Sequence, residues 1–422
     1  MSTNNLFVKT YSPSGLGYLN ITDADTNALV AQLIPGGFHS VLDYSVTPNG
    51  NYVALSEANF LYIYNAPTYT LAHTLNMATM FPGLSVTSMD WVQTSNNRVY
   101  ITGISATHIY VGIYNIGSNT VATPITVAAF PTTPRYLDWA GISTRTFDGR
   151  YFYFQYYNYP TPVSTTTLCI DDTTQSIVST SPSAAFPQFS SIDSSRLYGS
   201  FNSSIAVFSA GSTTHTEHAY APGGTAPILL TSSNDDSAVY VINYVGGVYA
   251  IRTYSTVTWT ALNAIPTGGT SVYAATGAPP NGNLPNAFVM ASTGVLNAGL
   301  VLSNTGVVLH TFPLLTTPSN VVLSRSGNTI TTAALSSGDG FGIQNTTTFA
   351  TVFYGASGLT DRRQFYTELA QSTQAGAVVA ASFTGTAVGT WTNGTATLTT
   401  TYTATAVATV TSRLTNSIVM IV

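Results

Sequence analysis

Charged residues are scarce along this chain. Only 6% of its 422 residues are Asp, Glu, Lys or Arg, whereas about 25% is usual for a soluble domain. Lys9 is the only lysine, beside ten arginines, so no basic run exists that could follow a phosphate backbone. We therefore expect no nucleic-acid partner, and we expect a surface covered mainly by hydroxyl and amide groups.

Cysteine and long apolar segments are also missing. Cys169 is the single cysteine, so the chain can form no internal disulfide and no multi-cysteine zinc site. No stretch approaches about 18 uninterrupted apolar residues, and the start lacks a basic segment followed by an apolar one. We expect neither a membrane span nor a signal peptide.

Apolar and aromatic residues, by contrast, are plentiful. They make up 44% and 12% of the chain, enough to bury a core. Because β-branched and aromatic residues favour strands, the composition predicts an all-β fold.

A polar turn followed by an alternating apolar strand recurs along the chain. The clearest copy is VTPNGNYVALSEANFLYIYNAPTYTLAHTL, residues 46–75, in which Pro48-Asn49-Gly50 marks a tight turn. Equivalent turns near residues 49, 96, 148, 194, 235, 282 and 327 are spaced by about 46 residues on average. This period predicts a β-propeller of about eight four-stranded blades, with a seven-bladed ring as the alternative.

The N-terminal copy of the repeat lacks its innermost strand. Since closing the ring would remove two exposed sheet edges, we expect a segment after residue 355 to pair beside Leu6–Tyr11. The candidates are Gln364–Leu369 and Ala377–Phe383. We accordingly divide the chain into a propeller, residues 1–355, and a ring-closing strand with a small C-terminal β extension for packing or oligomerisation, residues 356–422.

The C-terminal extension is rich in Ala and Thr and has few large residues with which to hold a core alone. It ends in an apolar strand that would be hazardous if it were exposed. We predict an oligomer contact at its last five residues, Ile418, Val419, Met420, Ile421 and Val422.

Three acidic residues recur at the same place in consecutive innermost strands: Asp43, Asp90 and Asp138, spaced by 47 and 48 residues. Innermost strands line a propeller's channel, so one interpretation is an acidic arc that binds a cation or sugar hydroxyls. The alternative is a structural tie, in which each carboxylate accepts backbone hydrogen bonds from the adjoining blade. Recurrence at equivalent positions is expected of such a tie too, and we favour it.

Other acidic and histidine clusters are interpreted as structural. On a strand, His215 and Glu217 share one face while His218 points away, so the three do not converge on a metal ion. The pairs Asp171-Asp172 and Asp235-Asp236 lie in turns, where Asp forms local backbone bonds. The sequence predicts no metal site and no cofactor.

Aromatic residues crowd between residues 151 and 159. Alternation sends about half of them to a blade interface, which assigns those to the core. The run ends toward a loop, where Tyr156, Tyr157 and Tyr159 are candidates for stacking on sugar rings or anchoring a protein partner.

The segments VTPNGNYVAL, NNRVYITG and DDSAVYVINY, the last with Tyr240-Val241-Ile242-Asn243, resemble YVTN-type propeller repeats of microbial surface proteins and lactonase-like propellers. The resemblance covers about residues 6–355 and implies a propeller, while it says little of function. Lactonase-like propellers use a few acidic, His or Arg residues at the channel mouth, but no catalytic motif matches here residue by residue. No nucleophile elbow, phosphate loop or metalloprotease helix is present either.

These features predict a non-enzymatic structural or binding protein, which we expect to be a virion component such as a phage tail, fibre or capsid-decorating protein. Its expected partners are other assembly subunits, and a host glycan or receptor. The surface composition is that of extracellular β-proteins without an export signal, and release by lysis reconciles the two. The alternatives are a microbial surface or secreted carbohydrate-binding propeller, and a lactonase-like hydrolase.

Overall fold

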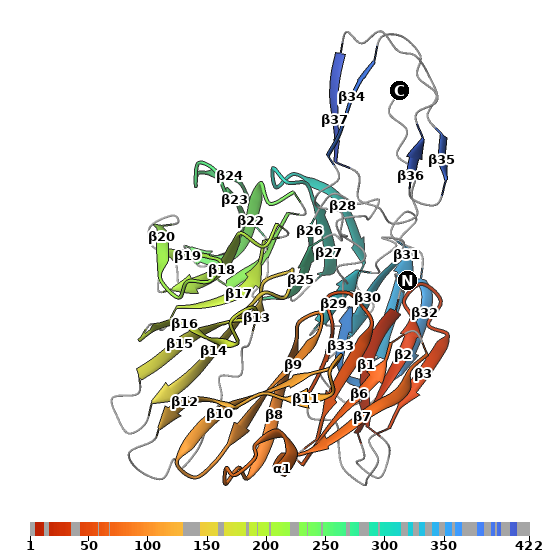
Figure 1. Cartoon of the computed structure of the whole chain (residues 1–422). Coiled ribbons are helices and arrows are strands. Elements are labelled where there is room, and N and C mark those ends of the chain that lie inside the picture. Colours follow the sequence, from red (N-terminus) through yellow and green to blue (C-terminus); the bar gives the residue numbers. More distant parts are fainter. Residues whose placement is uncertain are drawn as a thin grey trace.

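The computed structural model describes residues 5–11, 17–34, 43–57, 59–66, 68–129, 144–158, 164–182, 185–191, 193–201, 204–219, 228–233, 235–245, 248–266, 271–277, 287–293, 296–313, 320–323, 329–333, 340–345, 351–356, 359–364, 378–383, 390–392, 395–397 and 406–411. In these residues the chain is an all-β propeller, and Figure 1 shows its sheets following one another around a ring.

Antiparallel sheets of four principal strands form the blades. From the innermost strand outward, blade 1 contains β33 (Leu359–Gln364), β1 (Asn5–Tyr11), β2 (Gly17–Asp23) and β3 (Leu29–Leu33); blade 2 contains β4 (Asp43–Val46), β5 (Tyr52–Ser56), β6 (Phe60–Asn65) and β7 (Thr70–Asn76); blade 3 contains β8 (Ser88–Thr94), β9 (Arg98–Ile104), β10 (His108–Asn115) and an outer strand in two parts, β11 (Thr120–Val121) and β12 (Ile125–Ala129); blade 4 contains β13 (Thr144–Arg145), β14 (Tyr151–Asn158), β15 (Ser164–Asp171) and β16 (Ser176–Ser181).

The second half of the ring repeats this order. Blade 5 contains β17 (Phe186–Ser190), β18 (Arg196–Phe201), β19 (Ser204–Ser209) and β20 (His215–Ala219); blade 6 contains β21 (Ile228–Ser232), β22 (Ala238–Val245), β23 (Val248–Ser255) and β24 (Ala261–Pro266); blade 7 contains β25 (Ser271–Gly277), β26 (Ala287–Thr293), β27 (Leu296–Leu302) and β28 (Val308–Pro313); blade 8 contains β29 (Asn320–Leu323), β30 (Thr329–Ala333), β31 (Gly340–Asn345) and β32 (Thr351–Ala356). Among the described residues there are thus eight blades, as the repeat period predicted.

The middle and outer strands of a blade differ in burial. In β6 four consecutive residues are buried, because neighbouring blades cover both faces of a middle strand. The outer strand β16 alternates between exposed and half-buried residues, since its position at the rim leaves one face in water.

The hydrophobic core is divided among the joints between blades. Six apolar clusters in the described part of the chain fill the joints from blades 1 and 2 through blades 6 and 7. Each joint places large side chains from one sheet against the next, and six tyrosines are among the largest fully buried residues. Each blade therefore depends on its neighbours for its core.

A short helix, α1 (Met77–Met80), follows the outer strand of blade 2. The buried ring of Phe81 lies just after it and packs so closely over Gly103 that an added Cβ there would lie 2.5 Å from the ring. Glycine is therefore required at position 103. Among the described residues, no helix has the length and hydropathy needed to cross a bilayer.

Blade 1 is completed by two segments that lie far apart in the sequence. The strand β33 pairs antiparallel beside β1, with Lys9 opposite Asp361 (Figure 1). The closing strand shares only Gln364 with the expected candidate Gln364–Leu369, whose other residues lie outside the described ranges. The second candidate, Ala377–Phe383, does not close the ring.

The second candidate lies in the C-terminal extension instead. There β34 (Val378–Phe383) pairs with β37 (Ala406–Thr411), and β35 (Thr390–Thr392) pairs with β36 (Thr395–Thr397). Figure 1 shows the two strand pairs standing apart from the blades. The domain boundary at residue 355 stays a prediction.

Candidate functional site

Two sets of turns share one face of the propeller. In five blades, a backbone N–H of the turn between the third and fourth strands donates to a carbonyl of the turn between the first and second strands. These pairs are Ala66 to Asn51, Ile116 to Asn97, Asp172 to Arg150, Ala210 to Ser195 and Thr256 to Ser237. The face that these turns form, called the turn face below, is the part of the molecule where most described carboxylates lie.

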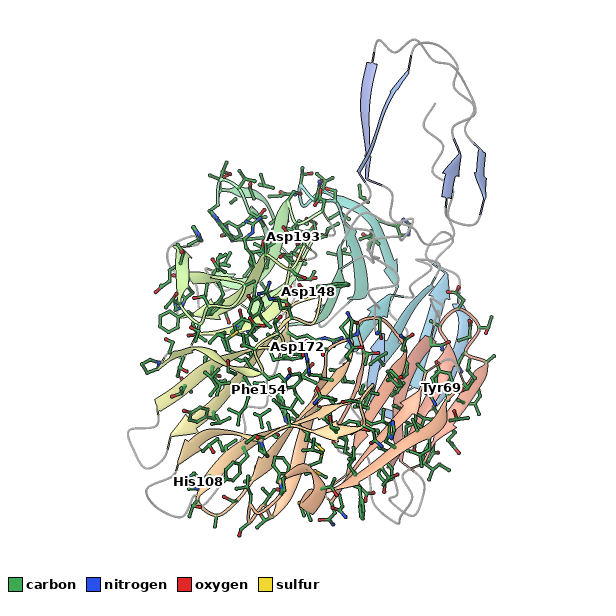
Figure 2. All side chains as sticks on the ribbon, viewed as in Figure 1. Tyr69, His108, Asp148, Phe154, Asp172 and Asp193 are labelled. Atoms are coloured by element: carbon green, nitrogen blue, oxygen red, sulfur yellow. The ribbon has the colours of Figure 1, made fainter. Side chains whose placement is uncertain are left out.

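The acidic residues in the turns between the first and second strands form hydrogen bonds within their own turns. Asp148, Asp193 and Asp235 each accept a hydrogen bond of 2.6 Å from the hydroxyl two residues earlier (Asp148 and Asp193 are labelled in Figure 2). Although partial burial opposes ionisation, hydrogen bonds from Ser233, Ser237 and Asn304 lower the pKa of Asp235 to about 2. These carboxylates hold the turns in shape, as the interpretation of Asp235 as a turn residue predicted.

Some turns also bind the neighbouring blade. The backbone N–H of Asp148 donates to Ser194 Oγ at 2.9 Å, and Asn304 Nδ2 donates to Asp235 Oδ2 at 3.0 Å. On the turn face, these hydrogen bonds join blade 4 to blade 5 and blade 6 to blade 7.

In several joints, a buried tyrosine on the second strand of one blade forms a hydrogen bond with the next blade. The hydroxyl of Tyr100 donates to Asp172 Oδ1 at 2.7 Å, and that of Tyr240 donates to the carbonyl of Ser303 at 2.7 Å. Tyr153 accepts from the N–H of Gly211 at 2.8 Å. Burial raises the pKa of each of these tyrosines, so they remain neutral hydrogen-bonding groups.

The joint between blades 3 and 4 carries the tightest ion pair in the described residues. Arg98 Nη1 lies 2.8 Å from Asp172 Oδ2 and also donates to the Asp172 carbonyl at 2.9 Å, while its Nε donates to Asn115 at 2.8 Å. Arg98 is therefore fully engaged in joining the two blades.

The innermost strands of blades 2 to 4 are linked by polar side chains. Asp43 Oδ2 accepts from the N–H of Val92 in blade 3 at 3.0 Å, and Ser45 shares a hydrogen bond of 2.9 Å with Thr94. Arg145 of β13 reaches across both strands and donates to Thr94 and to the Val46 carbonyl.

The Asp43 contact is the one that the structural-tie interpretation describes. The side chain of Asp90 and the whole of Asp138 lie outside the described residues, so Asp43 is the one predicted channel residue whose side chain the structure places. Ligand binding by Asp43, Asp90 and Asp138 stays a prediction.

The histidines of β20 lie on opposite sides of the strand, as alternation predicted. His215 contacts the rings of Phe201 and Phe208 and lies 3.8 Å from Glu217 Oε1. His218 instead stacks on Trp259 of blade 6, with ring centroids 4.0 Å apart and planes 8° from parallel. Burial lowers the pKa of His218, and no group of His, Cys, Asp or Glu side chains in the described residues is arranged to hold a metal ion.

The remaining predicted contacts are only partly described. Tyr156 is half-buried and packs against the core at the joint between blades 3 and 4. The side chain of Tyr157, the residue Tyr159 and the five C-terminal residues, Ile418, Val419, Met420, Ile421 and Val422, lie outside the described ranges. The surface role of the tyrosines and the terminal oligomer contact stay predictions.

The single thiol has no open access. Cys169 is fully buried, and burial raises its pKa to about 12. A buried, protonated thiol is a poor nucleophile, so Cys169 serves packing at the joint between blades 4 and 5.

The outer strands carry a feature that sequence reasoning missed. Across the outer strands of the described blades, from β3 to β32, Glu217 is the single residue among Asp, Glu, Lys and Arg. We call these strands the outer rim. The strand boundaries had to be known before this distribution of charge could be seen.

Comparison with known proteins supports the architecture. No family model matches the chain, and a search of curated proteins found no match. Dihydro-heme d1 dehydrogenase NirN in complex with DHE is similar in structure, with a TM-score of 0.58 and 12% identity over 86% of this chain and 76% of that chain. A eukaryotic initiation factor gives a TM-score of 0.50 and 11% identity over 86% of this chain and 98% of that chain.

At these identities the likeness concerns the fold alone. The chain has a propeller fold.

Proposed function

We propose that this protein is a non-enzymatic structural and binding component of a larger assembly, and specifically of a virion. The supporting observation is the uncharged outer rim, in which Glu217 is the single charged residue of the described outer strands. Edge strands that face only water are usually protected by charges such as Lys. A rim without such charges suits burial against a neighbouring subunit.

The state of the described carboxylates supports a role without catalysis. Asp43, Asp148, Asp172 and Asp235 each accept hydrogen bonds that fix a turn or a joint. A general acid or base works best with a pKa near the operating pH, whereas the pKa of Asp235 is lowered to about 2. Such residues act as structural ties.

We also propose that the blades belong to the YVTN type of propeller repeat. The segment Tyr240-Val241-Ile242-Asn243 lies on β22, the second strand of blade 6. Three of its residues are buried, and the Tyr240 hydroxyl reaches blade 7. This gives the repeat a structural reason, because the motif contributes both core and joint.

Analytical ultracentrifugation of the purified chain tests the assembly. We expect a defined multimer that persists at high salt, because an uncharged interface gains little from Coulomb attraction. A monomer at every concentration would contradict the proposal.

Mass spectrometry of gradient-purified particles from the source organism tests the virion location. We expect peptides of this chain in the particle fraction, at a constant ratio to the major particle proteins. Recovery from cell surfaces or culture fluid without particles would favour the carbohydrate-binding alternative, and lactone hydrolysis by a monomer would favour the hydrolase.

A further inference from the structure

The turn between the first and second strands of blade 2 contains the pair Asn49-Gly50. Asn-Gly pairs deamidate spontaneously, because glycine has no side chain to hinder the reaction. The backbone nitrogen of the glycine attacks Cγ of the asparagine side chain, a C–N bond forms, and ammonia leaves. Water then opens the resulting succinimide ring and gives aspartate or isoaspartate. Two further pairs lie outside the described residues: Asn281-Gly282 and Asn393-Gly394.

Hydrogen bonds hold both reacting groups of Asn49-Gly50 in the folded chain. The attacking nitrogen carries the Gly50 N–H, which donates to the Thr47 carbonyl at 2.7 Å. The Oδ1 of Asn49 accepts from Thr47 Oγ1 at 2.7 Å and from the Asn51 N–H at 3.1 Å. Since the Gly50 nitrogen must lose its proton before it attacks, the reaction requires an opened turn.

Blade 3 adds two hydrogen bonds to the same asparagine. The Asn49 N–H donates to Asn96 Oδ1 at 2.6 Å, and Asn49 Nδ2 donates to the Asn96 carbonyl at 3.0 Å. Asn96 lies in the equivalent turn of blade 3, between β8 and β9. The amide group that deamidation removes is therefore also a contact between blades 2 and 3.

Three other blades show that the turn itself accepts an aspartate. Asp148, Asp193 and Asp235 occupy the equivalent position in blades 4, 5 and 6, and Oδ1 of each accepts from the N–H two residues later. Oδ1 of Asn49 accepts the same bond. An aspartate at position 49 would lack only the Nδ2 donor, so its carboxylate would face the Asn96 carbonyl with no hydrogen between them.

We propose that Asn49 is a deamidation site which the joint between blades 2 and 3 protects, and that its conversion to aspartate keeps the turn but loosens this joint. The conversion also adds a negative charge to the turn face, where most described carboxylates lie. This inference is independent of the role proposed above.

Peptide mapping by chromatography and mass spectrometry measures the rate of deamidation at position 49. The folded chain is compared with the chain in concentrated urea at the same pH and temperature. We expect the folded rate to be at least about 30-fold lower, because opening breaks hydrogen bonds both within the turn and across the joint. Equal rates in the two states would overturn the protection.

Two alanine variants of blade 3 test whether the protection comes from this joint. Asn96→Ala removes the acceptor of the Asn49 N–H and should raise the folded rate by about fivefold. Asn115→Ala is the matched control, because it removes an amide that accepts from Arg98 at the joint between blades 3 and 4. It should change the rate by less than about twofold. Circular dichroism checks that both variants fold, and no rise with Asn96→Ala, or an equal rise with both, would overturn the assignment.

Asn49→Asp tests the consequence of the reaction. Its matched control is Asn51→Asp, which adds the same charge to the same turn at an exposed position. We expect Asn49→Asp to lower the folding equilibrium constant, measured by urea unfolding, by about 10-fold more than the control does. Equal losses in the two variants would show that the amide of Asn49 does not hold the joint.

Discussion

The joint between blades 3 and 4 and the joint between blades 5 and 6 are held together by different contacts. Both begin with Arg-x-Tyr on the second strand, Arg98 and Tyr100 in one and Arg196 and Tyr198 in the other. In the first joint, the next blade provides the side chain of Asp172, which forms an ion pair with Arg98 at 2.8 Å. In the second joint, Arg196 donates a long hydrogen bond of 3.5 Å to the backbone carbonyl of Thr256. Thr256 lies in the outer turn of the next blade, which is the turn between its third and fourth strands.

An aromatic stack takes the place of the ion pair in the second joint. Trp259 stands in that turn with φ +55° and lies face to face with His218. The backbone framework is the same, and the outer turn of the following blade decides whether charge or aromatic contact holds the joint. The joints can therefore diverge one at a time without altering the ring.

The largest effect is expected from breaking the charged joint. Asp172→Ala removes the ion pair and the acceptor of the Tyr100 hydroxyl, and it should lower the free energy of unfolding by about 2 to 3 kcal/mol. Asp172→Asn keeps an acceptor without the charge and should cost about half as much. Urea unfolding measures both, and equal losses would show that the charge contributes nothing to this joint.

The aromatic joint should be the next most sensitive. Trp259→Ala removes the stack with His218 and should cost about 2 kcal/mol. Trp259→Gly should cost less, by up to about 1 kcal/mol, because glycine accepts a positive φ without strain. The two midpoints of urea unfolding decide the point, and an alanine variant as stable as the glycine variant would contradict it.

Single hydroxyls allow the comparison to be refined. Tyr100→Phe should cost about 1.5 kcal/mol, because its hydroxyl donates to an ionised carboxylate, and Tyr240→Phe about 1 kcal/mol, because its acceptor is a carbonyl. Thermal unfolding of the two variants, measured at one pH and salt concentration, gives the ranking. The reverse order would argue against charge assistance at Tyr100.

The smallest effect is a pH dependence confined to the aromatic joint. Burial lowers the pKa of His218, so the unfolded chain takes up this proton first as the pH falls below about 6.5. The contribution of His218 to stability is therefore complete above about pH 6.5 and declines below it. His218→Phe keeps a stacking ring and should flatten the change in urea midpoint between about pH 7.5 and 5.5. An unchanged slope would assign the pH dependence to other groups.

The blade pattern could be predicted because turn chemistry and strand period are local properties. Pro48-Asn49-Gly50 and its equivalents mark the turns, and the spacing between them gives the number of blades. The closing strand was placed too late, because Asp361, Arg362 and Arg363 do not look like strand residues. The register that sets Asp361 opposite Lys9 joins two distant parts of the chain, and no local pattern records it.

The contacts of the joints could not be assigned from the sequence. Whether Asp43 meets a ligand or the N–H of Val92 depends on how two blades are rotated against each other, which no local pattern records. The register shifts in the outer strands could not be predicted for another reason. An extra residue such as Val178 in β16 breaks the alternation by which strands are recognised. Trp259 at a positive φ was equally unforeseeable, because bulky residues rarely adopt that conformation.

The pairing of β33 with β1 delays the closure of the ring during synthesis. Residues 5–11 leave the ribosome among the first, yet the strand that covers their inner side ends at residue 364. At about 5 to 20 residues per second, that edge of the N-terminal sheet waits tens of seconds for its partner. A nascent ring that stays open so long is exposed to wrong pairings, so a chaperone that shields the first sheet should raise the yield of closed rings.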